Sequence, residues 1–351
     1  MSARKTTSAG SLWPETPPAG LIGIARLAAE SPLVEAKHRV EYLEMETRSL
    51  VGKCLSPRMP FVWTINPYRG CEFGCRYCYA RYTHEFMELR DPVLFETRIF
   101  AKRFDAGAFR AELARVPRAE SIWIGTATDP YQPAERRFRV TRGMLGVLAL
   151  EKGRRIGLTT KSDLIVRDLD LLAGIAAENS LHINVTITTL DEELARLLEP
   201  LAPRPWLRLR AVERLAEKGI RCTVLAHPVM PLINDGEASL DALCAAAARA
   251  GAVSFSAAPL FLKPCAQRVF LPFLNEHFPH LARRYRERYH RQAHLTGEYP
   301  ARLRERVAKL IAKHGLVERS AVDLPAAWPA EPQMELFEAR NEPRAASVLT
   351  C

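Results

Sequence analysis

The chain has 351 residues, of which 48% are hydrophobic, so it is long enough to bury the core of a large domain with extensions. Its formal net charge of +10 permits an anionic partner such as nucleic acid, although arginine supplies 40 of the 50 basic residues and a bias of the source genome accounts for part of that excess. No apolar run approaches the roughly 18 residues of a membrane span, and the N-terminus lacks the apolar segment of a signal peptide, so we expect no membrane span and a cytoplasmic location.

The N-terminal part of the chain divides at about residue 35. Residues 1–35 are rich in Ser, Thr, Pro and Gly with little periodicity, which predicts a flexible leader. Residues 37–50 alternate polar and apolar side chains, a pattern typical of an edge strand. A folded domain is therefore expected over residues 36–275.

Three cysteines, Cys71, Cys75 and Cys78, form a C-x3-C-x2-C run. Thiolates at this spacing favour an iron–sulfur cluster or zinc. Three ligands on a four-iron cube leave one iron free to bind a small chelating molecule. A structural zinc site normally needs four ligands, and the nearest candidates for a fourth, Cys54 and His84, lie outside any paired motif. Disulfides are not expected, because the remaining cysteines show no framework spacing.

A repeated pattern begins near residue 61, in which a β-branched run is followed by a turn and an amphipathic helix. The expected strands are residues 61–66, 121–126, 155–160, 182–188, 220–226 and 252–258. The expected helices are residues 105–116, 140–151, 165–177, 190–198 with 206–218, 236–250 and 267–275. This alternation implies a parallel sheet, because parallel neighbours require crossover connections. It predicts an α/β fold with a partial (β/α)6 TIM-type barrel, and a doubly wound open sheet is the alternative.

The segments that follow these strands are the candidate binding positions, because barrels of this type place their chemistry at the carboxyl ends of the strands. Residues 125–135 combine hydroxyls, two carboxylates and two prolines in a rigid, acceptor-rich turn, which favours a binding role. Lys161 follows the third strand and is either a carboxylate partner or a solvated lysine. Arg208 is either a bidentate partner for a carboxylate or an ordinary surface arginine. His227, after the fifth strand, is interpreted as a packed turn histidine, with a metal ligand or a catalytic acid as the alternative.

These segments resemble one branch of the radical S-adenosylmethionine (SAM) superfamily, the proteins related to spore photoproduct lyase. The cysteine spacing, with Tyr77 before the third cysteine, is highly specific for the superfamily. The resemblance spans about residues 56–275. The other matching segments are Asn66-Pro-Tyr-Arg-Gly-Cys71, Thr128-Asp-Pro-Tyr-Gln-Pro-Ala-Glu135, Thr160-Lys-Ser162, Arg167-Asp-Leu-Asp-Leu-Leu172, Glu199-Pro200 and Pro228-Val-Met-Pro-Leu-Ile-Asn-Asp235.

The resemblance implies a cofactor arrangement. It implies that the three cysteines hold a [4Fe–4S] cluster whose open iron chelates SAM. It also implies that a flavodoxin- or ferredoxin-type donor reduces the cluster. The reduced cluster then cleaves SAM to methionine and a 5′-deoxyadenosyl radical, which abstracts hydrogen from the substrate. The resemblance also implies that Tyr77 lies near the adenine. The remaining implied contacts to SAM are Gly125, Thr126, Thr128 and Asp129 toward the methionine amine, and Lys161, Ser162 and Arg208 toward the carboxylate and ribose.

The substrate is less well defined by the resemblance. Spore photoproduct lyase repairs a thymine dimer with a cysteine near the second barrel strand as hydrogen donor. The corresponding run here, residues 122–128, has no cysteine, which argues against DNA repair by the same route. Cys265, after the sixth strand, is the candidate substitute donor, and a buried structural thiol is the alternative interpretation.

The C-terminal part carries the strongest charge signal. Residues 277–319 contain eleven Lys/Arg and four Glu, a net charge of +7. Within them, residues 283–291 interleave Arg with Tyr, which suits phosphate contact and stacking on an unpaired base of a nucleic acid, whereas a solvated basic helix is the alternative. A basic helical extension is thus expected over residues 276–322. A disordered tail is expected over residues 323–351, which are rich in Pro, Ala and Glu.

Three classes of function are compatible with these patterns. The first is a radical SAM enzyme, lyase-like or of another reaction type, that acts on nucleic acid or on another substrate. The second is a non-catalytic nucleic-acid-binding protein organised by zinc or a cluster. The third is an electron-transfer protein.

Overall fold

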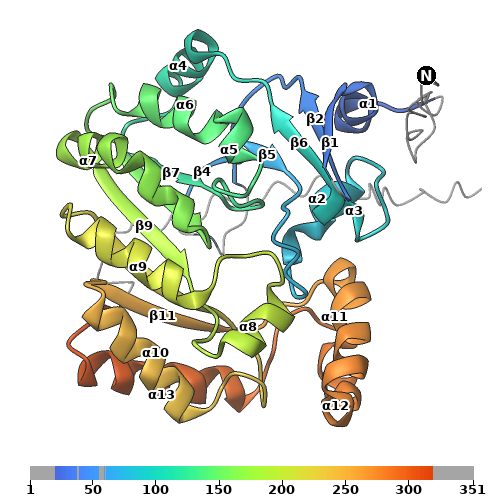
Figure 1. Ribbon diagram of the computed structural model, residues 1–351, viewed down its shortest axis with the longest axis vertical. Coiled ribbons are helices and arrows are strands. Elements are labelled where there is room, and N and C mark those ends of the chain that lie inside the picture. The colour runs from blue at the N-terminus through green and yellow to red at the C-terminus, as the bar shows by residue number, and fades with distance from the viewer. Residues whose placement is uncertain (1–19, 38, 55–58, 60, 319–351) are drawn as a thin grey trace, which may run out of the picture.

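The computed structural model describes residues 20–37, 39–54, 59 and 61–318 (Figure 1). Helix α1 (Gly23–Glu30) and the first residues of strand β1 (Leu33–Lys37) fall within residues 1–35, so this part of the expected flexible leader forms regular secondary structure instead. The physical reason is that α1 buries Ala25 and Ala28, a three-residue spacing on one helix face. Residues 1–19 and the predicted tail 323–351 lie outside the described residues.

The principal sheet has eight strands in the order β12-β11-β10-β9-β8-β7-β4-β3. The six predicted strands all form and are parallel to their neighbours: β4 (Trp63–Ile65), β7 (Ser121–Ile124), β8 (Arg155–Thr160), β9 (Ser180–Thr186), β10 (Arg221–Val229) and β11 (Ser254–Pro259). They lie side by side in chain order, whereas a doubly wound sheet reverses its order at a switch point. The sheet is therefore an open, parallel α/β arrangement like a partial barrel. At its edges, β3 (Val51–Lys53) pairs antiparallel with β4, and β12 (Val317–Glu318) pairs parallel with β11.

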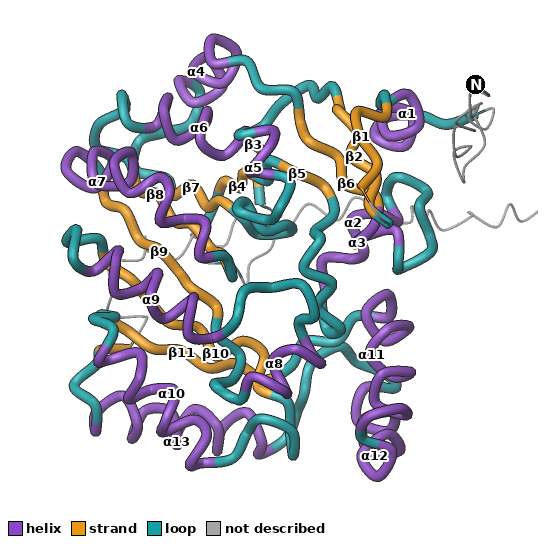
Figure 2. Tube along the Cα trace, in the orientation of Figure 1, coloured by secondary structure: helices purple, strands orange, loops and turns teal. Residues whose placement is uncertain are grey.

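Helices line the outer side of this sheet (Figure 2), and the crossovers between its strands pass through them. They are α4 (Ala106–Ala114), α5 (Glu135–Phe138), α6 (Val140–Leu148), η2 (Asp163–Asp168), α7 (Leu169–Glu178), α8 (Glu192–Leu198), α9 (Pro205–Ala216) and α10 (Glu237–Arg249). Fully buried Met144, Ile175 and Val212 share one core with Ile183 and Val224 of the central strands. Burial of this continuous apolar layer is what holds the strand ends in a fixed arrangement.

A second, four-stranded sheet has the order β1-β2-β6-β5. Strand β2 (Val40–Met45) lies within residues 37–50, where an edge strand was expected, but it is an inner strand because it pairs with β1 on one side and with β6 (Arg98–Lys102) on the other. Sequence patterns did not predict β6. Strand β5 (Tyr68–Arg69) pairs with β6 and leads into the cysteines. Short helices η1 (Tyr79–Arg81), α2 (Tyr82–Glu85) and α3 (Leu94–Thr97) connect the cysteines to β6.

The C-terminal helices are α11 (Pro264–His277), α12 (Pro279–Tyr289) and α13 (Glu298–Lys313). Helix α13 packs on α10 and β11, and its buried Leu303, Val307 and Leu310 belong to the same core as the sheet. Helices α11 and α12 form a separate pair (Figure 1), and their buried side chains share one apolar cluster with Cys71, Cys75 and Cys78. The predicted helical extension therefore contains two structural parts. No helix in the described ranges is both long and apolar enough to cross a membrane.

Candidate functional site

The cysteine loop begins with a close approach of two backbones. Gly70 has φ +82°, and a Cβ there would lie 2.8 Å from the carbonyl oxygen of Phe95 and 2.9 Å from that of Arg98. The next residue, Cys71, donates its backbone N–H to the same Phe95 carbonyl at 2.8 Å. Glycine is needed here because any side chain would push the loop away from α3 and β6.

The second half of the loop is held by a buried cation. The side chain of Arg81 is fully buried, and its guanidinium donates to the carbonyl oxygen of Cys75 at 3.0 Å and to the Glu96 carboxylate at 3.0 Å. The backbone N–H of Arg76 donates to the carbonyl oxygen of Leu198 at 2.9 Å. These bonds tie the loop to α3 on one side and to the end of α8 on the other.

The three thiols are reduced and close together, and they have little exposure. Cys75 is buried, whereas Cys71 and Cys78 are partly buried. Burial raises the pKa of all three, and the pKa of Cys75 reaches about 12 even though the charge of Lys161 opposes the rise. The pKa of Cys71 is raised further by the charges of Asp129, Cys75 and Cys78. Buried neighbouring thiols of this kind lose their protons when they bind a metal centre.

The donor set fits an iron–sulfur cube better than a single ion. Within residues 20–37, 39–54, 59 and 61–318, no three His, Cys, Asp or Glu side chains converge on one metal-ion position. His84, a candidate fourth zinc ligand, is buried against Phe95 and Phe100 with its Nε2 3.1 Å from the Arg98 carbonyl oxygen. Burial lowers the pKa of His84 to about 4. A structural zinc site takes four protein ligands, whereas three thiolates suit an iron–sulfur cluster with one iron left open.

The turn after β7 clamps the start of the cysteine loop. Thr128 Oγ1 donates to the carbonyl oxygen of Gly70 at 2.6 Å, and Gln132 Nε2 donates to the same oxygen at 3.0 Å. Gln132 Oε1 in turn accepts from the backbone N–H of Glu72 at 3.0 Å. The predicted binding residue Thr128 thus bonds the loop itself. The sequence analysis gave Gln132 no role. The feature that could have indicated one is its carboxamide group, which can donate and accept hydrogen bonds at the same time.

Asp129 holds the turn after β8 in the same way. Its carboxylate accepts from Thr160 Oγ1 at 2.7 Å and from the backbone N–H of Lys161 at 2.6 Å. It also accepts from the backbone N–H of Tyr131 at 2.9 Å. Burial raises its pKa, and these three hydrogen bonds oppose the rise. Both oxygens of Asp129 are therefore engaged with the protein, so its direct effect is to position Lys161.

Gly125 and Thr126 sit where β4 and β7 meet. Gly125 has φ +85°, and a Cβ there would lie 2.5 Å from the Thr159 carbonyl oxygen. Thr126 Oγ1 lies 2.5 Å from Thr64 Oγ1 and accepts from Asn66 Nδ2 at 3.0 Å. Asn66 Oδ1 accepts from the backbone N–H of Ala127 at 2.7 Å. Asn66 is a positioning residue that sequence reasoning missed, although it opens the matching segment before the cysteines.

Arg208 does not present an open fork. Its guanidinium lies 2.5 Å from the Glu199 carboxylate, and both side chains are 1% exposed. It also donates to the carbonyl oxygens of Pro203 at 2.7 Å and Thr186 at 3.1 Å. The expectation that Arg208 offers its fork to a SAM carboxylate was therefore wrong in its physical basis, because a buried guanidinium needs the protein's own acceptors.

Tyr77 is buried beside this ion pair and donates its hydroxyl to Glu199, which also accepts from Thr188 Oγ1 at 2.5 Å. Burial opposes ionisation of Glu199, but the charges of Arg208 and Lys161 and the two hydroxyls lower its pKa overall. Lys161 Nζ lies 5.7 Å from the centre of the Tyr77 ring. Lys161 is partly exposed.

The remaining candidate residues are Ser162, Cys265 and His227. Ser162 is buried, and its Oγ accepts from the backbone N–H of Leu164 at 3.2 Å as the cap of η2. Cys265 is 4% exposed near the start of α11, with its Sγ 3.7 Å from the carbonyl oxygen of Tyr79. The structure thus brings Cys265 to the cysteine loop, whereas His227 lies in β10 with its Nε2 3.2 Å from Ser256 Oγ.

The basic segment 283–291 differs from its prediction in one respect. Tyr285 and Tyr289 are each 1% exposed and donate to the carbonyl oxygens of Pro231 at 2.8 Å and Leu260 at 2.9 Å. Neither ring is available to stack on a base. The expectation of tyrosine stacking was wrong because the helical repeat turns both rings toward the core, while the arginines between them are exposed.

Comparison with known proteins identifies the family. The sequence model described as "Radical SAM superfamily" matches residues 65–243. An uncharacterized protein of Mycobacterium tuberculosis (strain ATCC 25618 / H37Rv) is 39% identical over 259 residues, which cover 74% of this chain and 76% of that protein. An uncharacterized protein of Methanocaldococcus jannaschii is 26% identical over 203 residues, with coverage of 57% and 71%.

Solved structures agree with this assignment at the level of the fold. Spore photoproduct lyase complexed with dinucleoside spore photoproduct superposes with a TM-score of 0.59 at 14% identity, and the match covers 85% of this chain and 84% of that one. A point mutant of the same lyase gives a TM-score of 0.60 at 15% identity, with coverage of 88% and 86%. The family implies SAM and an iron–sulfur cluster as cofactors. This chain belongs to the radical SAM superfamily.

Proposed function

We propose that this chain is a radical SAM enzyme that binds a [4Fe–4S] cluster through Cys71, Cys75 and Cys78. The observation that carries the proposal is the set of three reduced cysteines within eight residues of one loop, which hydrogen bonds hold to α3, α8 and the turn after β7. A [4Fe–4S] cluster held by these cysteines would supply the electron for reductive cleavage of SAM, and the cleaved cofactor would supply the hydrogen abstraction from the substrate.

The residues around the loop divide into two roles in this proposal. Lys161 contacts SAM, because it is the predicted cation with a partly exposed side chain near the thiols. Tyr77 and the backbone of residues 125–127 form the surface beneath the cofactor. The positioning residues, whose polar atoms bond the protein, are Thr126, Thr128, Asp129, Ser162 and Arg208.

We further propose a nucleic acid as the substrate class and Cys265 as the hydrogen donor. The exposed arginines of α12 support a nucleic acid as the substrate. The position of Cys265 supports its role as donor, because its Sγ lies 3.7 Å from the carbonyl oxygen of Tyr79, the residue after Cys78. The reaction differs from thymine-dimer repair in its donor position, since residues 122–128 hold no cysteine. A flavodoxin- or ferredoxin-type protein in the cytoplasm supplies the electron.

Anaerobic reconstitution with iron and sulfide tests the enzyme assignment. We expect a brown protein with about four irons per chain that forms 5′-deoxyadenosine from SAM when reduced. Cys75→Ala should lose the iron and remain soluble, while Cys222→Ala, at a buried cysteine of β10, should keep it. Colourless protein with bound zinc would instead support the non-catalytic nucleic-acid-binding class. A cluster that cycles but leaves SAM intact would support electron transfer.

A further inference from the structure

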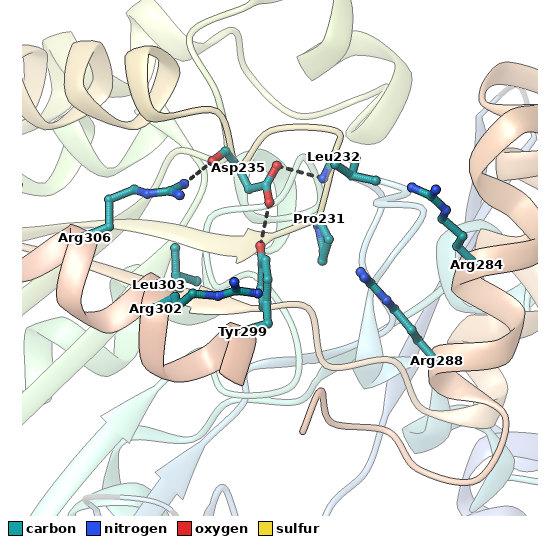
Figure 3. A pocket seen from close by; sticks show the side chains of 9 residues that line it. All are labelled: Pro231, Leu232, Asp235, Arg284, Arg288, Tyr299, Arg302, Leu303 and Arg306. Atoms are coloured by element: carbon teal, nitrogen blue, oxygen red, sulfur yellow. Dashed lines mark hydrogen bonds between the residues drawn. The ribbon is translucent and has the colours of Figure 1, made fainter. Parts of the chain in front are cut away.

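A positively charged cleft lies between α12 and α13 (Figure 3). It has a volume of about 350 Å³ and opens beside the loop that follows β10. Arg284 and Arg288 project into it from α12, and Arg302 and Arg306 from α13. The remaining lining residues are Pro231, Leu232, Asp235, Tyr299 and Leu303.

The one carboxylate among the described residues that line the cleft is already engaged by the protein. Asp235 Oδ1 accepts from the backbone N–H of Leu232 at 2.7 Å, and its Oδ2 accepts from the Tyr299 hydroxyl at 3.0 Å. Arg306 donates to the backbone carbonyl oxygen of Asp235 at 2.8 Å. Asp235 therefore shapes the floor of the cleft and offsets only a quarter of the charge of four guanidinium groups.

Two of the four arginines are not paired with a carboxylate of the described residues. Within the described part of the chain, neither Arg284 nor Arg288 makes a salt bridge or a side-chain hydrogen bond. Arg302 faces Glu298 at 3.8 Å, but Glu298 is 85% exposed, so water and salt screen this pair. Arg284 and Arg288 are thus available to an anionic ligand, whereas Arg306 keeps its hydrogen bond to Asp235 and contributes its positive charge.

The orientation of α12 is set before any ligand arrives. The buried rings of Tyr285 and Tyr289 stack with their centres 5.9 Å apart, and both hydroxyls bond the core. Arg284 and Arg288 precede these tyrosines by one position each, so both lie on the adjoining face of the helix, toward α13. The helix cannot rotate these arginines away without breaking two buried hydrogen bonds.

The cleft is connected to the cysteine site through hydrogen bonds. Asn234, next to Asp235, donates its Nδ2 to the Thr188 carbonyl oxygen at 3.0 Å. Thr188 Oγ1 donates to Glu199, which also accepts from Tyr77 between the cysteines. The loops after β9 and β10 therefore join the floor of the cleft to the side chains packed against Tyr77.

We infer that this cleft binds consecutive phosphates of a single nucleic-acid strand whose next base extends toward the cysteine loop. Arginine forks match phosphate oxygens in pairs, and two facing rows of arginine suit a backbone with a charge at every nucleotide. Among the described residues, Tyr299 is the aromatic side chain that lines the cleft, and its hydroxyl bonds Asp235, so the cleft holds the backbone and not the bases. The inference rests on the proposed function for its substrate class, but its test needs neither SAM cleavage nor a reductant.

The test uses the full-length reconstituted chain and fluorescence anisotropy with a short fluorescein-labelled single-stranded oligodeoxynucleotide at several KCl concentrations. We expect Arg284→Gln combined with Arg288→Gln to weaken binding and to flatten the salt slope by about 1.4, or about 0.7 for each phosphate that is no longer neutralised. The control is Arg110→Gln combined with Arg304→Gln, which removes the same charge from exposed positions outside the cleft. The control should leave the slope unchanged.

Equal slopes in the cleft and control variants would overturn the inference, because binding would then reflect overall charge. Full displacement of the strand by the mononucleotide AMP or by inorganic phosphate at the same phosphate concentration would also overturn it in favour of a small phosphate ligand. A duplex that binds as tightly as the single strand would contradict the choice of strand. SAM cleavage by the same preparation is measured separately, so a failed cofactor assignment is distinguished from a failed cleft.

Discussion

Arg208 lies 2.5 Å from Glu199 with both side chains 1% exposed, so a buried ion pair stands directly beneath the tyrosine of the cysteine loop. Removing one partner would leave the other charge buried without compensation. We expect Arg208→Met to lower the free energy of unfolding by about 3–5 kcal/mol, measured by urea denaturation. The double variant Glu199→Gln with Arg208→Met should recover part of that loss.

The matched control for the buried pair is Arg204→Met. Arg204 lies 3.3 Å from Glu192 with 56% and 45% of the two side chains exposed, so the change should cost no more than about 1 kcal/mol. A similar loss in Arg204→Met and Arg208→Met would contradict a special role for the buried pair.

Gly125 and Gly153 allow strain in the backbone to be separated from steric conflict. Both have positive φ, +85° and +69°, but a Cβ at Gly153 would meet nothing within 4 Å. We expect Gly153→Ala to cost about 1–2 kcal/mol, the penalty of the left-handed conformation alone. Gly125→Ala should cost clearly more in the same thermal or urea unfolding experiment, because Thr159 must move. Equal losses would argue against the close approach at Gly125.

Lys161 provides a test of the proposed cofactor contacts. We expect Lys161→Met to keep its iron but to bind SAM roughly ten- to a hundredfold more weakly, which corresponds to the loss of a charged hydrogen bond of about 1.5–3 kcal/mol. Equilibrium dialysis of the reconstituted protein measures this affinity. Lys152→Met, at an exposed lysine paired with Glu178, is the control that should bind SAM normally. Unchanged affinity in Lys161→Met would remove Lys161 from the cofactor site.

Lys102 should make stability depend on pH. It is 7% exposed in β6, and burial, with a smaller contribution from the charge of Arg69, lowers its pKa from 10.5 to about 7. Between about pH 7 and 10.5 the unfolded chain binds more protons at this lysine than the folded chain, so stability should rise with pH by at most about 1.4 kcal/mol per unit.

A series of urea denaturations between about pH 7 and 10.5 tests this prediction. Lys102→Met should abolish the rise in stability that this lysine causes, whereas Lys218→Met, at an exposed lysine, should show the same rise as the parent. A Lys102→Met protein with the same slope as the parent would show that this lysine does not titrate in that range.

Local sequence patterns determined the elements of the principal sheet. Alternating β-branched runs and amphipathic helices predicted β8 and α6 nearly to their ends, because each pattern depends on neighbours within one element. The second sheet was missed, since β6 is a run of five residues whose partner β2 lies more than fifty positions earlier, and no local period reveals that pairing.

The sequence by itself also determined the three thiols and the family, because the cysteine ligands lie within eight residues and need no distant contact to be recognised. The directions of Arg208, Asp129 and Tyr285 were decided only by the tertiary structure. Arg208 pairs with Glu199, Asp129 accepts from Thr160, and Tyr285 donates to Pro231, and each partner lies elsewhere in the chain. The free energy of burying a polar group depends on such a partner. Residue type and spacing state which chemistry is available, whereas long-range packing selects which of those groups face a ligand.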